Sequence, residues 1–200
     1  MLIGGGSPSE RITVLNNYTY GDERGGGSVC LGYTARYNED VTVRGNYFVG
    51  PLDLVRWKRV TFEDNTLVGR GRLLRVQPAQ GAEARTSRLS PVLVARPKGA
   101  KVIVRPNRYE PGRAHVIVYN WDRKKSIAAD LSGVLKDGGK YRVVSAQDFF
   151  GEPVAGGTFD GKPVKLPMRA YRAAPPIGMP EHKPPVTGPV FNVFVVLPAG

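Results

Sequence analysis

ITVLNNYTYG (Ile12–Gly21), VTVRGNYFVG (Val41–Gly50) and VTFEDNTLVG (Val60–Gly69) are three copies of one ten-residue phrase. The copies begin 29 and 19 residues apart, each opens with β-branched residues, and each closes on glycine. The sixth position of every copy is asparagine: Asn17, Asn46 and Asn65. A strand that recurs at intervals of this size is typical of solenoids, which stack short repeats along one axis. The pattern therefore predicts parallel strands stacked coil upon coil.

The recurrent asparagine has a physical reason to occupy one position in each coil. A bend between two strands often needs a left-handed backbone conformation, which asparagine tolerates better than most residues. Asparagine side chains that stack from coil to coil can also satisfy one another's buried polar groups. We therefore expect Asn17, Asn46 and Asn65 to form a structural ladder. The alternative is that the three phrases are unrelated antiparallel strands.

The remainder of the chain divides by composition into a linker and a second β-rich part. We expect β-helix coils, about three of them, over residues 1–76. Residues 77–100, rich in Ala, Gln, Ser and Pro, are expected to form a linker with one edge strand. Short strands separated by turn signals predict an antiparallel β-sandwich over residues 101–200. These strands are expected at residues 101–104, 114–121, 126–131, 140–146, 152–159, 163–168 and 190–197. The predicted fold class is thus all-β, a short right-handed parallel β-helix followed by a sandwich.

The net charge of +12 and the isoelectric point near 10 limit the partners to be expected. Such a field attracts polyanions, among them acidic polysaccharides. Nucleic acid is not expected, because the positive residues are scattered and no basic helix or RNA-binding sheet motif occurs. No apolar stretch approaches 18 residues, so no membrane span is expected, and no signal peptide is visible. The single cysteine, Cys30, rules out an intrachain disulfide.

Two segments resemble parts of known proteins. The pattern V-T-[VF]-x-x-N-[YT]-x-x-G resembles the C-terminal coils of right-handed parallel β-helix proteins, the pectate-lyase-like superfamily. The stretch VIVYNWDRKKSIAADLSGVLKDGGKYRVVSAQDFFGEPV (residues 116–154) resembles the small β-sandwich that follows many glycan-active catalytic domains. The resemblance implies a bacterial protein that acts outside the cytoplasm, extracellular or periplasmic.

Proteins of the resembled kind usually run through many coils, whereas only about three are expected here. The resemblance therefore implies a fragment or a short form of a longer protein. A coil stack of this length leaves an unpaired strand edge at its N-terminal end. We expect this edge to be covered by self-association into a homo-oligomer or by a partner segment.

Motifs for metal, cofactor or nucleophilic chemistry are lacking in the sequence. His115 and His182 are the two histidines, and no HExxH or Cys/His spacing occurs. No G-x-S-x-G elbow is present, and GVLKDGGK (residues 133–140) fails as a phosphate loop. The sequence predicts no metal site and no cofactor, and leaves a calcium requirement open.

Carboxylates near the phrases are weak candidates for catalysis. A glycoside hydrolase needs two carboxyl groups roughly 5 to 9.5 Å apart. Equivalent positions on neighbouring coils lie about 4.8 Å apart, so Glu23, Glu39 and Glu63 could approach one another on one face. The alternative is that these acids are ordinary turn and edge residues. The candidate catalytic residues are Asp22, Glu23, Glu39, Asp40 and Glu63.

Aromatic residues beside arginine offer a second kind of site. Flat rings suit sugar faces, and guanidinium groups suit hydroxyls and uronates. The candidate ligand-binding residues are Tyr20, Arg24, Tyr37 and Trp57. The alternative is that these rings stack in the core.

Three functions are compatible with these observations. The first is a part of an extracellular glycan-active β-helix protein that binds or supports an acidic polysaccharide without a complete catalytic site. The second is an enzyme, a polysaccharide lyase or glycoside hydrolase with carboxylates on the coil face. The third is a structural cap or adhesin module. The incomplete catalytic set favours the first.

Overall fold

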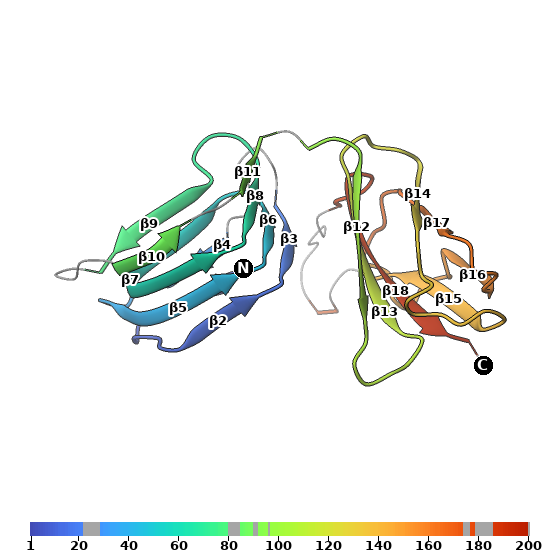
Figure 1. The fold of residues 1–200 in the computed structure, drawn as a ribbon, viewed down its shortest axis with the longest axis horizontal. Helices are drawn as coiled ribbons and strands as arrows, with labels where there is room; N and C mark the ends of the chain where they lie inside the picture. The colour runs from blue at the N-terminus through green and yellow to red at the C-terminus, as the bar shows by residue number, and fades with distance from the viewer. Residues whose placement is uncertain are drawn as a thin grey trace. The chain divides into compact units, whose positions relative to one another are not determined.

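The computed structural model describes residues 1–21, 29–79, 85–89, 92–95, 97–173, 177–178 and 186–199. The described residues form 18 β-strands joined by turns and loops, with no helix (Figure 1). The chain is therefore all-β, with both parallel and antiparallel sheets. It separates into two compact units, Met1–Pro97 and Lys98–Gly200, which are described in turn.

Strands of the first unit pair in parallel and form three columns. One column contains β1 (Leu2–Ile3), β4 (Val29–Leu31), the first residues of β7 (Leu52–Glu63) and β9 (Leu74–Pro78). A second contains β2 (Ile12–Leu15), β5 (Asn38–Arg44), the remainder of β7 and β10 (Arg85–Leu89). The third contains β3 (Tyr18–Tyr20), β6 (Tyr47–Val49), β8 (Thr66–Val68) and β11 (Val92–Val94). The described strands thus visit the three columns in the same order four times.

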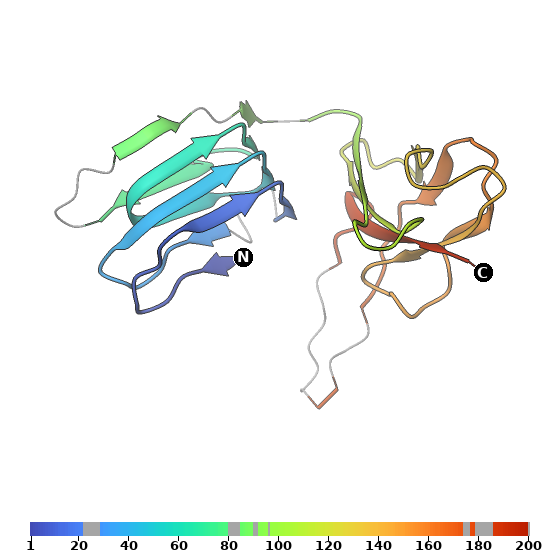
Figure 2. The same ribbon diagram turned by 60° about the horizontal axis from the view of Figure 1, so that its bottom comes forward.

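The register places the three phrases beside one another. Ile12 pairs with Val41, and Val41 pairs with Val60, so equivalent positions of the copies are neighbours. Figure 2 shows β2, β5 and β7 as adjacent strands that run in the same direction. The recurring sequence pattern therefore corresponds to a recurring position in space.

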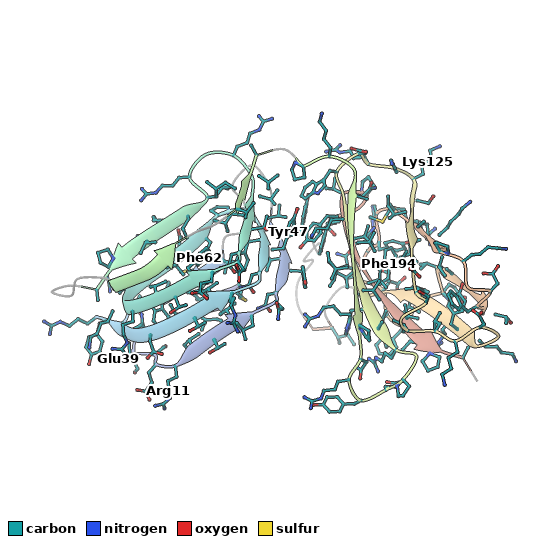
Figure 3. All side chains as sticks on the ribbon, in the orientation of Figure 1. Arg11, Glu39, Tyr47, Phe62, Lys125 and Phe194 are labelled. Carbon is teal, nitrogen blue, oxygen red and sulfur yellow. The ribbon has the colours of Figure 1, made fainter. Side chains whose placement is uncertain are left out.

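The core of the first unit follows from strand alternation. Val14, Val43 and Phe62 occupy equivalent positions and are buried, whereas the threonines one position earlier point outward. Trp57 is also inside, and Figure 3 shows Phe62 among these inward side chains. The apolar members of each phrase thus form continuous buried rows from coil to coil.

One segment differs in part from the expectation. The stretch over residues 77–100, expected to be a linker with one edge strand, contains two strands, β10 and β11, which pair in parallel with β7 and β8. The third phrase begins within a longer strand, because β7 runs without a break from Leu52 to Glu63. Arg56, with φ of 57°, lies where the register of β7 shifts against β9, and the strand turns there from one column to the next.

The second unit contains two antiparallel sheets. The larger has the order β12 (Ala100–Pro106), β13 (Ala114–Asn120), β18 (Phe191–Pro198), β15 (Lys140–Ser145) and β16 (Ala155–Thr158). The smaller pairs β14 (Ser126–Ala129) with β17 (Val164–Pro167). Side chains from both sheets share one core, including Val116, Phe194, Ile127 and Leu166.

Candidate functional site

A chain of side-chain amides links the coils of the first unit. The backbone N–H and Nδ2 of Asn17 donate to Oδ1 of Asn46, at 2.8 and 3.0 Å. The same two groups of Asn46 donate to Oδ1 of Asn65, at 3.0 and 2.8 Å. Asn46 and Asn65 are buried, and their Nδ2 groups also donate to the carbonyls of Val14 and Val43. The three asparagines therefore form a hydrogen-bonded ladder inside the bend.

The residue before each ladder asparagine makes the sharp turn. Asn16, Gly45 and Asp64 have φ values of 50°, 67° and 53°, in the left-handed region. The expectation that the ladder asparagine itself adopts this conformation was wrong. Glycine, asparagine and aspartate tolerate a left-handed backbone, and the turn they make leaves the next side chain pointing inward.

A second corner contains an amide that the sequence pattern did not reveal. Asn38 is fully buried, accepts from the backbone N–H of Ser9 at 3.0 Å, and donates to the carbonyl of Val55 at 3.1 Å. Its neighbour in the next coil is Trp57, whose indole N–H donates to the carbonyl of Leu31 at 2.8 Å. Because different residue types fill this corner, no repeat marks it in the sequence.

Carboxylates on the outer surface of the coils pair with cations of the next coil. Glu39 and Lys58 lie 2.7 Å apart, and Asp40 and Arg59 lie 3.3 Å apart. Arg75 binds Asp53 through two contacts, Nε to Oδ1 at 2.9 Å and Nη2 to Oδ2 at 2.7 Å. These acids are therefore engaged in ion pairs between coils.

The carboxylates proposed from the sequence are not brought together as expected. Asn38 and Asp40 pair with Trp57 and Arg59, so Glu39 lies opposite Lys58. Glu63 is five residues further along β7, beside Arg44, which separates it from Glu39 by about 16 Å of strand length. The expected approach of Glu39 and Glu63 was thus wrong. Three further candidates lie outside the described residues: Asp22, Glu23 and Arg24.

The aromatic candidates have separate environments. Trp57 is 1% exposed and lies in the core, which removes it from the surface that a glycan can contact. Tyr37 is half-buried, and Nζ of Lys58 lies 3.9 Å above the centre of its ring. Tyr20 is half-buried in β3, where it pairs with Val49. Of these rings, Tyr37 has the cationic neighbour that sugar-binding sites often include.

Cys30 lies on the outer side of β4. Its S–H donates to the carbonyl of Gly32 at 3.1 Å. Partial burial raises the pKa of the thiol, and the carboxylate of Asp53 raises it further, while Arg75 opposes this. The thiol form is therefore favoured, which makes Cys30 a poor nucleophile.

Exposed cations lie in the small sheet of the second unit and in the segment directly before it. Arg123, Lys124, Lys125 and Lys165 are exposed, and we call them the basic patch. The N–H of Met168 donates to the carbonyl of Lys125, and Lys165 lies opposite Ala128, so both lysines lie at the small sheet. Figure 3 shows Lys125 directed away from the core of its unit.

Three of the four cations of the basic patch are not neutralised by a carboxylate of the described residues. Lys124 lies 4.0 Å from Asp122, and Arg123, Lys125 and Lys165 enter no ion pair among the described residues. The second unit carries 16 Lys and Arg against 8 Asp and Glu. The basic patch therefore offers positive charge that the described protein does not neutralise.

Two searches of the described residues were negative. No cluster of three or more His, Cys, Asp or Glu side chains could hold a metal ion in this part of the chain. Within the same residues, no helix has the length and apolar character needed to span a membrane.

The chain was compared with protein-family models, curated protein sequences and solved structures. No protein-family model, no curated protein sequence and no solved structure matches this chain.

Proposed function

We propose that this chain is a non-catalytic module that binds an acidic polysaccharide through the basic patch of its second unit. The supporting observation is the set of exposed cations, Arg123, Lys125 and Lys165, that form no ion pair among the described residues. Uronate or sulfate groups of a linear glycan would neutralise these positive charges. Because exposed charges are screened beyond about 8 Å at physiological ionic strength, binding should weaken as salt is added.

The architecture suited to this role is, in our proposal, a short right-handed parallel β-helix followed by a β-sandwich. The four passes through three parallel columns support the first part, and the core shared by two antiparallel sheets supports the second. The proposal also places the protein outside the cytoplasm, where acidic polysaccharides occur.

A lyase or glycosidase on the coil face is less well supported. A glycosidase needs one carboxyl group that stays protonated and one that is ionised and free to act. Glu39, Asp40 and Asp53 are instead each held by a cation of the next coil.

A panel of polymers tests the proposal. Retardation of the protein in gels that contain polygalacturonate, alginate, neutral glucan or double-stranded DNA is measured at low and at physiological salt. Unsaturated products and reducing ends are followed in the same mixtures. We expect retardation by the acidic glycans, none by glucan, and no product.

Each other outcome of the panel contradicts a part of the proposal. Retardation by DNA at concentrations that leave the acidic glycans without effect would make nucleic acid the better partner. Formation of product would show an enzyme. An absence of retardation in every gel would leave a structural role.

A further inference from the structure

The asparagine ladder has a direction. In both described steps the earlier coil supplies the donors, a backbone N–H and an Nδ2, and the later coil supplies the acceptor, an Oδ1. Asn17 stands at the N-terminal end of this series, and none of the hydrogen bonds of the described residues reaches its Oδ1. The ladder thus ends there in an open acceptor.

The strand next to this acceptor also has an open edge. Val14 directs its carbonyl toward the second coil, where it accepts from Nδ2 of Asn46. Neighbouring residues of a strand direct their polar groups to opposite sides, so Thr13 and Leu15 point to the other side. No described strand pairs with β2 on that side. The edge consequently presents the N–H of Thr13 and the carbonyl of Leu15, which already accepts from Nδ2 of Asn17 and can accept a second bond, as the carbonyl of Arg44 does from Nδ2 of Asn46 and the N–H of Asn16.

We propose that this edge binds an extended polypeptide segment that runs parallel to β2 and places an asparagine opposite Asn17. The incoming backbone N–H and Nδ2 would donate to Oδ1 of Asn17, as those of Asn17 donate to Asn46. The residue before the incoming asparagine would donate to the carbonyl of Leu15, as Asn16 donates to Arg44. In strand addition of this kind, hydrogen bonds between backbones provide the affinity, and the side chain opposite Asn17 provides the specificity.

A second copy of this chain does not supply the required groups. If two copies met edge to edge, each would offer an Oδ1 of Asn17, and two acceptors cannot bond each other. The last described coil does not match either. Val92 donates to the carbonyl of Asn65, and the preceding residue in the sequence is Pro91, which has no N–H and no side-chain amide. The partner is therefore an extended segment that lies outside the described residues and carries asparagine in this position.

The probe is a labelled peptide with the sequence of residues 41–50, VTVRGNYFVG, which contains the asparagine in the correct register. Its binding to the full chain is followed by fluorescence anisotropy. We expect saturable binding, with a Kd at least tenfold weaker for the peptide in which the asparagine is replaced by leucine. The leucine peptide retains every backbone group, so the difference between the two Kd values measures what the asparagine side chain opposite Asn17 contributes.

Two variants of the protein test the position of the peptide. Thr13→Pro removes the outward N–H and leaves the pairing of β2 with β5 intact, and proline is tolerated on an edge strand. We expect this variant to weaken peptide binding at least tenfold. Thr13→Val retains the N–H and serves as the matched control with unchanged binding. Circular dichroism establishes that both variants are folded.

Three results would overturn the proposal. The first is equal affinity for the asparagine and leucine peptides, and the second is no saturable binding at millimolar peptide. The third is a concentration-dependent dimer in sedimentation that Thr13→Pro abolishes, because this would assign the edge to a second copy. None of these results affects the glycan proposal, which concerns the other unit.

Discussion

The Nδ2 of Asn46 lies 2.8 Å from the Oδ1 of Asn65, and both side chains are buried between coils that are 19 residues apart in the sequence. Oδ1 of Asn65 accepts a second bond from the backbone N–H of Asn46. One side-chain oxygen therefore satisfies two buried donors of the preceding coil. Removing it leaves the buried backbone N–H of Asn46 without a partner, whereas Nδ2 still donates to the carbonyls of Val14 and Arg44.

Asn65→Leu should destabilise the first unit by about 2 to 4 kcal/mol, because it leaves the N–H of Asn46 and the carbonyl of Val43 unpaired. Asn17→Leu is the matched control, since the backbone N–H of residue 17 still donates to Asn46. Its cost should be about 1 kcal/mol. Urea denaturation followed by circular dichroism measures both. Equal costs for the two variants would contradict the ladder.

Gly32→Ala should destabilise the same unit by about 3 kcal/mol or more. Gly32 has φ of 87°, and a Cβ there would overlap the carbonyl oxygen of Val55 and approach Nδ2 of Asn38. Gly71→Ala is the control, because φ is also positive but the space around a Cβ is open. It should cost about 1 kcal/mol. Thermal melts of the two variants that coincide would show that the close approach at Gly32 is not present.

Cys30 should react with a thiol reagent at higher pH in the folded protein than in urea. Burial, followed by the charge of Asp53, raises the pKa of its thiol. Because the folded pKa is above the unfolded one, the thiol contributes stability that is present below the unfolded pKa and lost as pH rises through the folded pKa. Asp53→Asn should move the pH–rate curve to lower pH. A shift of the curve to higher pH would contradict this assignment.

The sequence was sufficient to predict an all-β chain and the neighbouring positions of Asn17, Asn46 and Asn65, because one phrase recurs with its register intact. The last coil lacks this signal. Pro91 stands in the sequence where the phrase has asparagine, and residues 77–100 were assigned by composition to a linker with one edge strand. Strand β7 passes from one column to the next through the left-handed backbone of Arg56. An arginine in the sequence does not predict this backbone conformation.

The candidate site was harder to predict, because it depends on register between distant segments. Glu39 lies two residues before the second phrase and Glu63 is the fourth residue of the third, and pairing of β5 with β7 places Glu39 opposite Lys58 and Glu63 opposite Arg44. Lys165 follows Lys125 by 40 residues, and only the pairing of β14 with β17 brings them to one sheet. Asn38 has no asparagine or similar residue at its position in the next coil, so its burial could not be inferred from a repeat.

The central functional claim is that the basic patch, rather than the net charge, binds acidic glycan. Calorimetric titration with polygalacturonate tests it in the wild type and in two double charge reversals. Lys125→Glu with Lys165→Glu alters the patch, and Arg70→Glu with Arg72→Glu makes the same change of charge at exposed positions of the first unit. We predict that the first pair weakens binding at least tenfold and the second less than twofold. Equal weakening by the two pairs, or unchanged binding in the first, would contradict the account.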